Sequence, residues 1–247
     1  MPFFKKLGEE YHAQVKKLET AIWKHAGREF NINSSKQLGE ILFDELNLAP
    51  ASGKKLKKTT GGARSTRESE LEKLREVHPI VDLILNYREL TKLLSTYIDT
   101  LPLLVKEDGR IHARFDQAGT TTGRFSSRDP NLQNIPVKTD VGKQIRYGFV
   151  AAPRHVLMSL DYSQIELRIA ALLAGDEYLA QVFRDEKDVH SAVASRVFGV
   201  PENEVTHEMR RRAKVINFGI LYGMGVTALQ QNLGTTRAEA QEFYNNY

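Results

Sequence analysis

A single carboxylate after a short apolar run is the first feature of the sequence that could do chemistry. The run Val156–Leu160 has the length and composition of a buried strand, and Asp161 follows it directly. Ser163 and Glu166 then have the spacing of a capping box, which predicts a helix starting at Ser163. A carboxylate between a strand and a helix N-terminus is well placed to hold a divalent metal and a phosphate. On spacing alone, the simpler interpretation is a turn residue at Asp161 and a cap at Glu166.

The helix predicted after Asp161 has one apolar face. Its apolar residues recur at the i, i+4, i+7 and i+8 positions: Ile165, Ile169, Leu172 and Leu173. This spacing predicts that the helix buries that face against the rest of the protein. The strand and the helix would then hold Asp161 in a fixed position.

A second candidate site lies on a helix that Thr206 is expected to cap. Four side chains recur at every fourth position along one side of it: Arg210, Lys214, Phe218 and Tyr222. Two cations can bind a triphosphate, and two aromatic rings can support a sugar and a base. The alternative is a basic surface patch beside a buried aromatic pair. Gly219 and Gly223 favour a function, because each costs about 1 kcal/mol relative to Ala and so indicates close approach or movement.

Two polar stretches have the composition of nucleic-acid contacts. The run Gly53–Arg67 holds six Lys and Arg residues and no acid, which predicts a flexible loop able to contact a phosphate backbone. A solvated linker is the simpler alternative for a lone basic run. The stretch Thr120–Pro136 is rich in Arg, Gln, Asn, Ser and Thr, whose donors could reach phosphates or groove edges.

Cysteine and histidine usage excludes some kinds of site. The chain has no cysteine, which excludes disulfides and thiolate metal sites and is typical of a reducing cytoplasm. His190 has no second histidine nearby at ligand spacing, so we do not interpret it as a metal ligand. A lone histidine near a helix start is more often a cap or a surface residue than a catalyst.

The composition is that of a globular protein with room for a partner of negative charge. The chain has 247 residues, with 41% hydrophobic and 27% charged residues, enough for one large domain or two small ones. The net charge of +4 permits a polyanionic partner without requiring one. No apolar run approaches the roughly 20 residues that span a bilayer, and the N-terminus lacks a signal-peptide pattern. We therefore expect no membrane association, and the lack of cysteine fits a cytoplasmic location.

Most of the chain has helical periodicity. The apolar residues from Phe4 to Ile22 predict one long helix, which Gly27 would end. A second helix is expected from Ser34 or Ser35. Helices resume near residue 68, and two long helices joined at Pro79 predict an extended helical hairpin. Between residues 103 and 115, an Asp-Gly pair at positions 108 and 109 predicts a β-hairpin turn.

Five segments of the chain resemble family A DNA polymerases, the bacterial DNA polymerase I group. Asp161–Arg168 is similar to motif A of that family, and Arg210–Gly223 is similar to motif B. Thr122–Ser127 and Asp129–Pro136 are similar to a signature upstream of motif A, and Tyr87–Lys92 resembles part of the thumb. The motifs occur in the family order, so the match is highly specific. The resemblance implies DNA-templated DNA synthesis on a primer 3′-hydroxyl, in replication and repair.

The resemblance also implies roles for individual residues. Asp161 and the backbone carbonyl of Tyr162 would bind Mg²⁺, with two ions expected in the full enzyme, and Asp161, Arg210 and Lys214 would be catalytic. The incoming deoxynucleoside triphosphate would contact Gln164, Glu166, His190, Arg210, Lys214, Phe218 and Tyr222. Primer–template DNA would contact Lys54, Lys55, Arg64, Arg124, Gln133, Asn134 and Lys138.

The sequence departs from the family pattern after motif B. The family's third motif, a His-Asp-Glu segment that carries the second metal-binding carboxylate, occurs nowhere in these residues. We therefore expect a fragment, weak or inactive as a polymerase by itself, whose partner is a missing C-terminal polymerase portion. The alternative is a DNA-binding module without catalysis. A third hypothesis, a single-subunit RNA polymerase, is disfavoured because Glu166 together with Phe218 suits selection of deoxynucleotides.

The resemblance implies a mostly helical α+β fold, part of a right-hand polymerase. Residues 1–104 would form a helical thumb with an N-terminal connecting helix. Residues 105–175 would form a partial antiparallel palm sheet with motif A, and residues 176–247 partial fingers with motif B. Sheet edges left unpaired in such a fragment would favour association with further chain.

Overall fold

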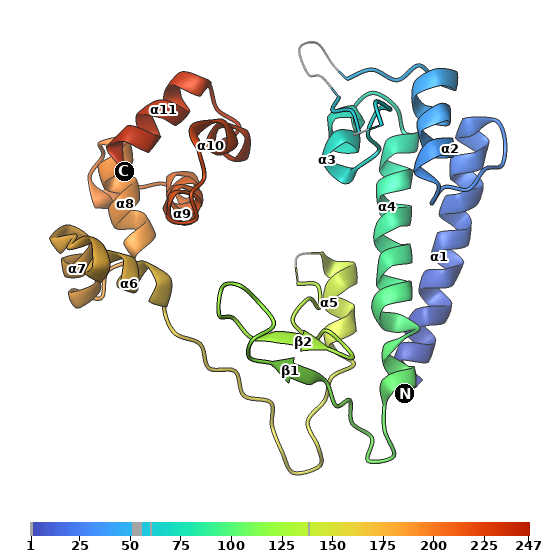
Figure 1. Cartoon of the computed structure of the whole chain (residues 1–247), viewed down its shortest axis with the longest axis horizontal. Helices are drawn as coiled ribbons and strands as arrows, with labels where there is room; N and C mark the ends of the chain where they lie inside the picture. Colours follow the sequence, from blue (N-terminus) through green and yellow to red (C-terminus); the bar gives the residue numbers. More distant parts are fainter. Residues whose placement is uncertain (1, 51–55, 60, 138) are drawn as a thin grey trace. The chain divides into compact units, whose positions relative to one another are not determined.

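The computed structural model describes residues 2–50, 56–59, 61–137 and 139–247 of the chain (Figure 1). It is mostly helical with a small antiparallel sheet, which confirms the predicted α+β class. The chain forms two compact units, Met1–Leu157 and Met158–Tyr247. The boundary between them falls inside the expected palm, and the division into thumb, palm and fingers stays a prediction. Among the described helices, none combines the length and apolar character needed to cross a membrane.

Two long helices form the centre of the first unit. Helix α1 (Pro2–Ala26) buries residues at helical spacing, including Leu7 and Tyr11, and packs along α4 (Ile80–Leu93) (Figure 1). Gly27 follows α1 with a φ of +76°, so the predicted end of this helix is confirmed. Helix α4 continues into a π-helical turn, η3 (Leu94–Ile98).

Short elements cover one end of these two helices. Ser34 caps the first of them, accepting a hydrogen bond from the Gln37 N–H at 3.4 Å, as the sequence predicted. The extended hairpin expected around Pro79 is wrong, because only short turns precede that proline and the long partner of α4 is α1. The remaining elements of the unit are α2 (Ser35–Gly39), η1 (Glu40–Glu45), α3 (Glu68–Leu71), η2 (Glu72–Leu74), η4 (Leu101–Leu104) and α5 (Asp140–Arg146).

A two-stranded antiparallel sheet is the one sheet in the described part of the chain. Strand β1 (Arg114–Asp116) pairs with β2 (Ser126–Arg128), and Phe115 lies opposite Ser127. Just before it, an isolated bridge joins Val105 to Ile111 around the predicted Asp-Gly turn. Gly109 has a φ of +76° in that turn, a value that favours glycine, so the turn prediction is confirmed.

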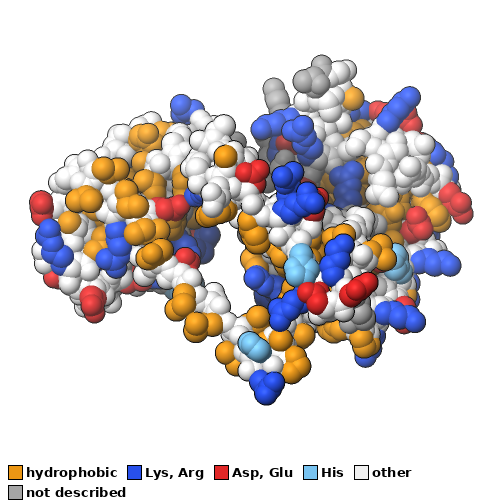
Figure 2. All heavy atoms as spheres, turned by 60° about the horizontal axis from the view of Figure 1, so that its bottom comes forward, with side chains coloured by type: hydrophobic (Ala, Val, Ile, Leu, Met, Phe, Trp, Pro, Cys, Tyr) orange, Lys and Arg blue, Asp and Glu red, His pale blue; other side chains and the backbone are white. Residues whose placement is uncertain are grey.

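The buried strand expected at Val156–Leu160 is wrong. These residues form no strand, and the side chains of Val156 and Leu160 are 86% and 84% exposed. A strand is stable when a neighbouring strand satisfies its backbone hydrogen bonds and a core covers one face, and the described chain provides neither here. Figure 2 shows hydrophobic side chains exposed along this extended segment.

The second unit is a cluster of helices around its own core. Helices α8 (Val189–Phe198) and α9 (His207–Leu221) pack closely against each other, and the fully buried residues of the core include Ala194, Ile216 and Leu229. The elements are α6 (Ile165–Ala174), α7 (Glu177–Arg184), α8 (Val189–Phe198), η5 (Glu202–Glu204), α9 (His207–Leu221), α10 (Val226–Leu233) and α11 (Arg237–Asn246).

Helix α6 differs from its prediction in its start and in its buried face. It begins at Ile165, after Gln164 with a φ of +54°, and no side chain caps it, so the predicted capping box is wrong. The buried residues are Leu167 and Ala171. The predicted core face is exposed, with Leu172 and Leu173 about four-fifths accessible, because α6 packs on its own unit through the side that carries Leu167 and Ala171.

Candidate nucleotide and nucleic-acid site

Helix α9 presents the predicted cation–aromatic stripe. Arg210, Lys214 and Phe218 lie on the helix, and Tyr222 follows as its C-terminal capping residue. The Thr206 hydroxyl accepts a hydrogen bond from the Met209 N–H at 3.2 Å, which fixes the helix start as predicted. Four-residue spacing therefore places the two cations and Phe218 along one side of a rigid element.

Arg210 is held by an acidic partner from the neighbouring helix. Its Nη2 lies 2.7 Å from Asp188 Oδ2, and its Nε donates to both carboxylate oxygens at 3.2 Å. Asp188 also caps α8, accepting from the Ser191 N–H at 2.7 Å. Burial acts to raise the pKa of Asp188, but the hydrogen bonds from Arg210 and Ser191 outweigh it and lower that pKa to about 2. Asp188 is therefore an anion that orients Arg210.

His190 is enclosed by groups from the segment before α6 and from α9. The imidazole is 1% exposed, and its centroid lies 5.8 Å from the Phe218 ring. Its Nε2 lies 3.3 Å from the Gln164 amide nitrogen, and its Nδ1 lies 2.9 Å from the Asn217 amide nitrogen. Burial lowers the pKa of His190; Asp188 opposes this shift, and nearby cations reinforce it. The histidine is thus a neutral, buried group, in contrast to the surface or capping residue that is commonest.

Gly219 and Gly223, which lie beside the stripe, are each explained by a different structural requirement. A Cβ at Gly219 would lie 3.0 Å from Met224 Sδ, so glycine permits a close approach there. Gly223 has a φ of +75°, which ends the helix in a conformation that favours glycine. The two glycines, with Phe218 and Tyr222, line a surface hollow of about 500 Å³. The close approach predicted from the sequence is confirmed at Gly219.

The predicted metal ligands lie outside regular structure. Asp161 and Tyr162 are exposed residues in the segment before α6, and Glu166 lies in the first turn of that helix. Among the described residues, no group of three or more His, Asp or Glu side chains could hold a metal ion. Asp161 therefore does not by itself fit the expected magnesium site.

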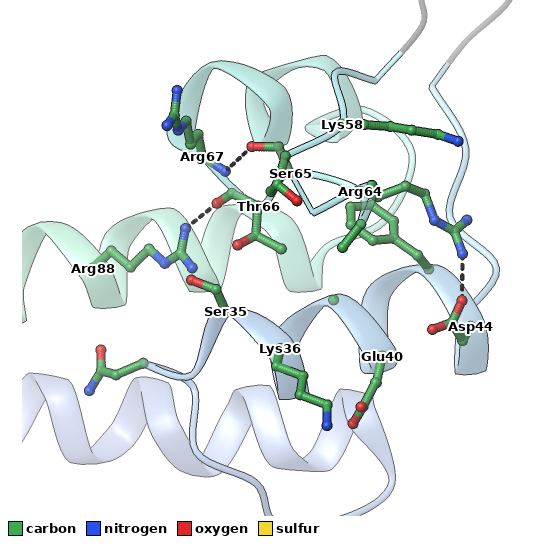
Figure 3. A pocket seen from close by; sticks show the side chains of 16 residues that line it. Ser35, Lys36, Glu40, Asp44, Lys58, Arg64, Ser65, Thr66, Arg67 and Arg88 are labelled. Carbon is green, nitrogen blue, oxygen red and sulfur yellow. Dashed lines mark hydrogen bonds and ion pairs between the residues drawn. The ribbon is translucent and has the colours of Figure 1, made fainter.

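A large basic cavity lies in the first unit, between α2, α4 and the described part of the predicted basic loop (Figure 3). Its volume is about 1120 Å³. Its charged lining comprises Lys36, Lys58, Arg64, Arg67, Arg88, Glu40 and Asp44. Five cations against two carboxylates give the cavity a positive charge, and a cavity of that charge attracts phosphates.

The described part of the basic loop forms a hydrogen-bonded turn, and the flexibility expected from its sequence stays a prediction. Lys58 and Arg64 form an antiparallel bridge, and the Thr59 N–H donates to the Ala63 carbonyl at 2.7 Å. The Glu70 carboxylate, 2% exposed, accepts from the Lys57 N–H at 2.8 Å and anchors the base of the turn. The predicted contacts Lys54 and Lys55 lie outside the described residues, as does Lys138.

Arg64 and Arg88 approach the cavity from different elements. The Arg64 guanidinium pairs with Asp44 and lies over the Phe43 ring, 4.9 Å from its centroid. Arg88 on α4 donates to the Thr66 carbonyl (Figure 3). Burial lowers the pKa of Arg88, yet a guanidinium stays charged at neutral pH. Both arginines are thus oriented by partners, and Arg88 also ties the basic turn to the long helix.

The remaining predicted DNA contacts lie on the turn-rich segment around β2. Arg124, Gln133 and Asn134 are exposed. The Gln133 amide donates to the Phe125 carbonyl at 2.9 Å, which brings Gln133 beside the turn that carries Arg124. The Asn134 carbonyl accepts from the Tyr97 hydroxyl. The structure therefore brings these three residues onto one segment, apart in sequence from the basic cavity.

Sequence reasoning missed three residues that orient the candidate site. Asp188 was not identified from the sequence, and Arg88 lay within the thumb-like segment Tyr87–Lys92 without a role of its own, because no spacing rule links residues 22 positions apart. Asn217 could have been noticed from the sequence, because asparagine is unfavourable inside a helix and its presence there indicates a specific side-chain contact. The structure supplies that reason as its contact with His190.

Comparison with known proteins identifies the family of this chain. The model of DNA polymerase family A matches residues 1–247. The thermostable DNA polymerase I of Thermus aquaticus is 52% identical over 246 residues, which cover 99% of this chain and 29% of that protein. The DNA polymerase I of Bacillus subtilis is 48% identical over 245 residues, 98% of this chain and 27% of that protein.

A solved structure agrees in fold. The POL domain of Pol1 from M. smegmatis, in complex with DNA primer-template and dNTP, matches with a TM-score of 0.87 and 38% identity. The match covers 100% of this chain and 43% of that chain. The chain spans less than a third of the length of the two curated relatives. Family model, relatives and fold agree over the whole sequence, and the chain belongs to DNA polymerase family A.

Proposed function

We propose that this chain supplies the nucleotide-binding helix and part of the DNA grip of a DNA-templated DNA polymerase. The reaction would be transfer of a deoxynucleotide from its triphosphate to a primer 3′-hydroxyl, in replication and repair. Substrates of this kind accompany the M. smegmatis domain, whose structure is a complex with primer-template and dNTP. The proposal places the activity in the cytoplasm, at the chromosomal DNA.

The observation that carries the proposal is the arrangement around α9. Lys214 and Arg210 bring two positive charges to one side of the helix, and Arg210 is already oriented by Asp188. Phe218 follows on the same side and contacts His190, which also meets Gln164. Cations can neutralise a triphosphate, and an aromatic face can pack on a sugar. Glu166 and Tyr222 would then exclude a 2′-hydroxyl.

The basic cavity of the first unit would hold the phosphate backbone of the primer–template. Lys58, Arg64 and Arg67 come from one turn and line the cavity with Arg88 (Figure 3). Phosphate contacts of this kind supply affinity and position without reading the base sequence. Arg124, Gln133 and Asn134 would contact the duplex at a second point.

A complete magnesium site would need ligands in addition to those that the described residues provide. Asp161 and the Tyr162 carbonyl would contribute to a magnesium site that a further, C-terminal polymerase portion completes. Magnesium would neutralise the triphosphate and activate the primer hydroxyl when bound. The chain by itself is then expected to bind substrates without efficient primer extension.

Nucleotide binding tests the role of α9. We expect Lys214→Ala to weaken binding of a fluorescent deoxynucleoside triphosphate at least tenfold, since a hydrogen bond to a charged group contributes about 1.5–3 kcal/mol. The assay would use the chain with a primer–template duplex and Mg²⁺. Arg237→Ala removes a positive charge from α11 of the same unit and should leave affinity unchanged. Equal losses in both variants would mean that α9 contributes only net charge, and would contradict the proposed site.

A further inference from the structure

Two amide side chains meet the two ring nitrogens of His190, and they cannot both donate to it. The amide nitrogens of Asn217 and Gln164 lie 2.9 Å and 3.3 Å from Nδ1 and Nε2. A neutral imidazole has one acceptor nitrogen and one N–H. One of the two amides must therefore turn its oxygen toward the ring, since amide nitrogen and oxygen are assigned from the hydrogen-bond network.

Burial decides which amide turns. Asn217 is 0% exposed and sits on α9, packed between helices, whereas Gln164 is half-buried on the segment before α6. In the arrangement shown, the Asn217 nitrogen donates to Nδ1 and its Oδ1 is buried without a hydrogen-bond partner. Turning Asn217 would leave its NH₂ group, with two donors, unsatisfied in the same place, and burial of unpaired donors is unfavourable. Gln164 can turn its oxygen to Nε2 at little cost.

We propose that Asn217 is a positioning residue that holds His190 in the Nε2–H tautomer. The Asn217 amide donates to Nδ1, so the ring proton lies on Nε2. That proton points toward Gln164, on the side where the proposed nucleotide would bind. The inference rests on the proposed function for its purpose, although the tautomer itself does not depend on it.

The tautomer decides the sign of the interaction with a phosphate. With the proton on Nε2, a neutral His190 donates a hydrogen bond to a phosphate oxygen that replaces the Gln164 amide. With the proton on Nδ1, the Nε2 lone pair would face the phosphate and repel it. A fully buried asparagine on α9 thus couples the nucleotide-binding helix to the neighbouring helix α8 through one ring.

Nitrogen NMR of the histidine rings tests the tautomer directly. The chain is labelled with ¹⁵N-histidine, and the His190 signals are assigned by their loss in His190→Gln. We expect a protonated Nε2 and an unprotonated Nδ1 at neutral pH. A proton on Nδ1, or on both nitrogens, would overturn the inference, whether or not the chain binds nucleotide.

Substitution of Asn217 tests its part in holding the tautomer. Asn217→Asp presents only acceptors to Nδ1 and should move the proton there, and Asn217→Leu should give a mixture of tautomers. Asn232→Leu, the same change on the exposed side of α10, should leave the His190 signals as they are. Unchanged His190 signals in a folded Asn217→Leu variant would overturn the inference. If neither Asn217 variant folds, the wild-type spectrum alone decides.

A double-mutant cycle tests the consequence for binding. Asn217→Leu should weaken binding of a deoxynucleoside triphosphate about tenfold in the wild-type background and have little effect in the His190→Gln background. Equal effects in both backgrounds would show that Asn217 acts through packing, which overturns its positioning role. Absence of nucleotide binding by the wild-type chain would instead count against the proposed function, with the tautomer still decided by NMR.

Discussion

Asp188 and Arg210 form the ion pair that orients the first cation of α9. Their side chains are 44% and 40% exposed, so solvent screens the pair and its contribution to stability is about 1 kcal/mol. The pKa of Asp188 falls from 3.8 to about 2. A carboxyl whose pKa is lower in the folded state stabilises that state above its ordinary pKa. This contribution is therefore present above pH 4 and is lost as the pH falls toward 2.

Asp188→Asn should remove this pH-dependent contribution while keeping a side chain able to cap α8. We expect the unfolding free energy of the variant at pH 7 to be about 1 kcal/mol below that of wild type. This difference in unfolding free energy should shrink as the pH falls through 4 toward 2. Urea unfolding of both proteins across this pH range measures the gap. Other carboxyls titrate equally in both proteins, so a gap that is constant with pH would contradict the role assigned to the pair.

At the level of single residues, the sequence predicted which side chains share the candidate site better than it predicted how each is held. The four-residue spacing placed Arg210, Lys214 and Phe218 on one side of a helix, because helix geometry is local. The partners of His190 lie on other elements, and local spacing carries no information about such contacts. The roles assigned from the family resemblance stay predictions.

The close approach at Gly219 is a property of α9 and the chain that follows it. Alanine there gains about 1 kcal/mol of helix propensity, but its Cβ would lie 3.0 Å from Met224 Sδ and 3.3 Å from Met224 Cε. Met224 would have to move, and the two effects oppose each other. The net change in unfolding free energy should therefore be small.

The effect of Gly219→Ala on the unfolding free energy should depend on whether Met224 is replaced by alanine. In the wild-type background we expect a change of less than about 1 kcal/mol, and in the Met224→Ala background a gain of about 1 kcal/mol, because only the helix propensity remains. Urea denaturation of the four proteins measures both differences. The same effect in both backgrounds would show that Met224 does not restrict position 219.

Helices were predicted more accurately than strands, for a physical reason. Helix α1 and the cap of α2 follow from hydrogen bonds and spacing within one segment. The strand expected at Val156–Leu160 depends on a neighbour, and the described residues place none beside it. The apolar face of α6 was wrong in the same way, since a periodic pattern shows that a face is apolar without showing what covers it.

At the scale of the whole molecule, the two units carry different parts of the proposed function. Unit Met1–Leu157 has its own buried clusters and the basic cavity, and unit Met158–Tyr247 has its own core and α9. Length and composition left open one large domain or two small ones, and the structure has two units. DNA affinity should therefore respond to charges in the first unit that lie far from the nucleotide stripe in sequence.

Binding of a labelled primer–template to the chain, measured by fluorescence anisotropy over a salt series, tests the central claim most directly. We expect binding that weakens steeply between about 50 and about 200 mM salt. Lys58→Ala with Arg67→Ala, both in the basic cavity, should weaken binding and reduce the salt slope by about 2. Lys5→Ala with Lys6→Ala removes two exposed charges at the opposite end of α1 (Figure 1) and should change neither. A folded wild-type chain without salt-sensitive binding, or equal losses in both double variants, would contradict the claim.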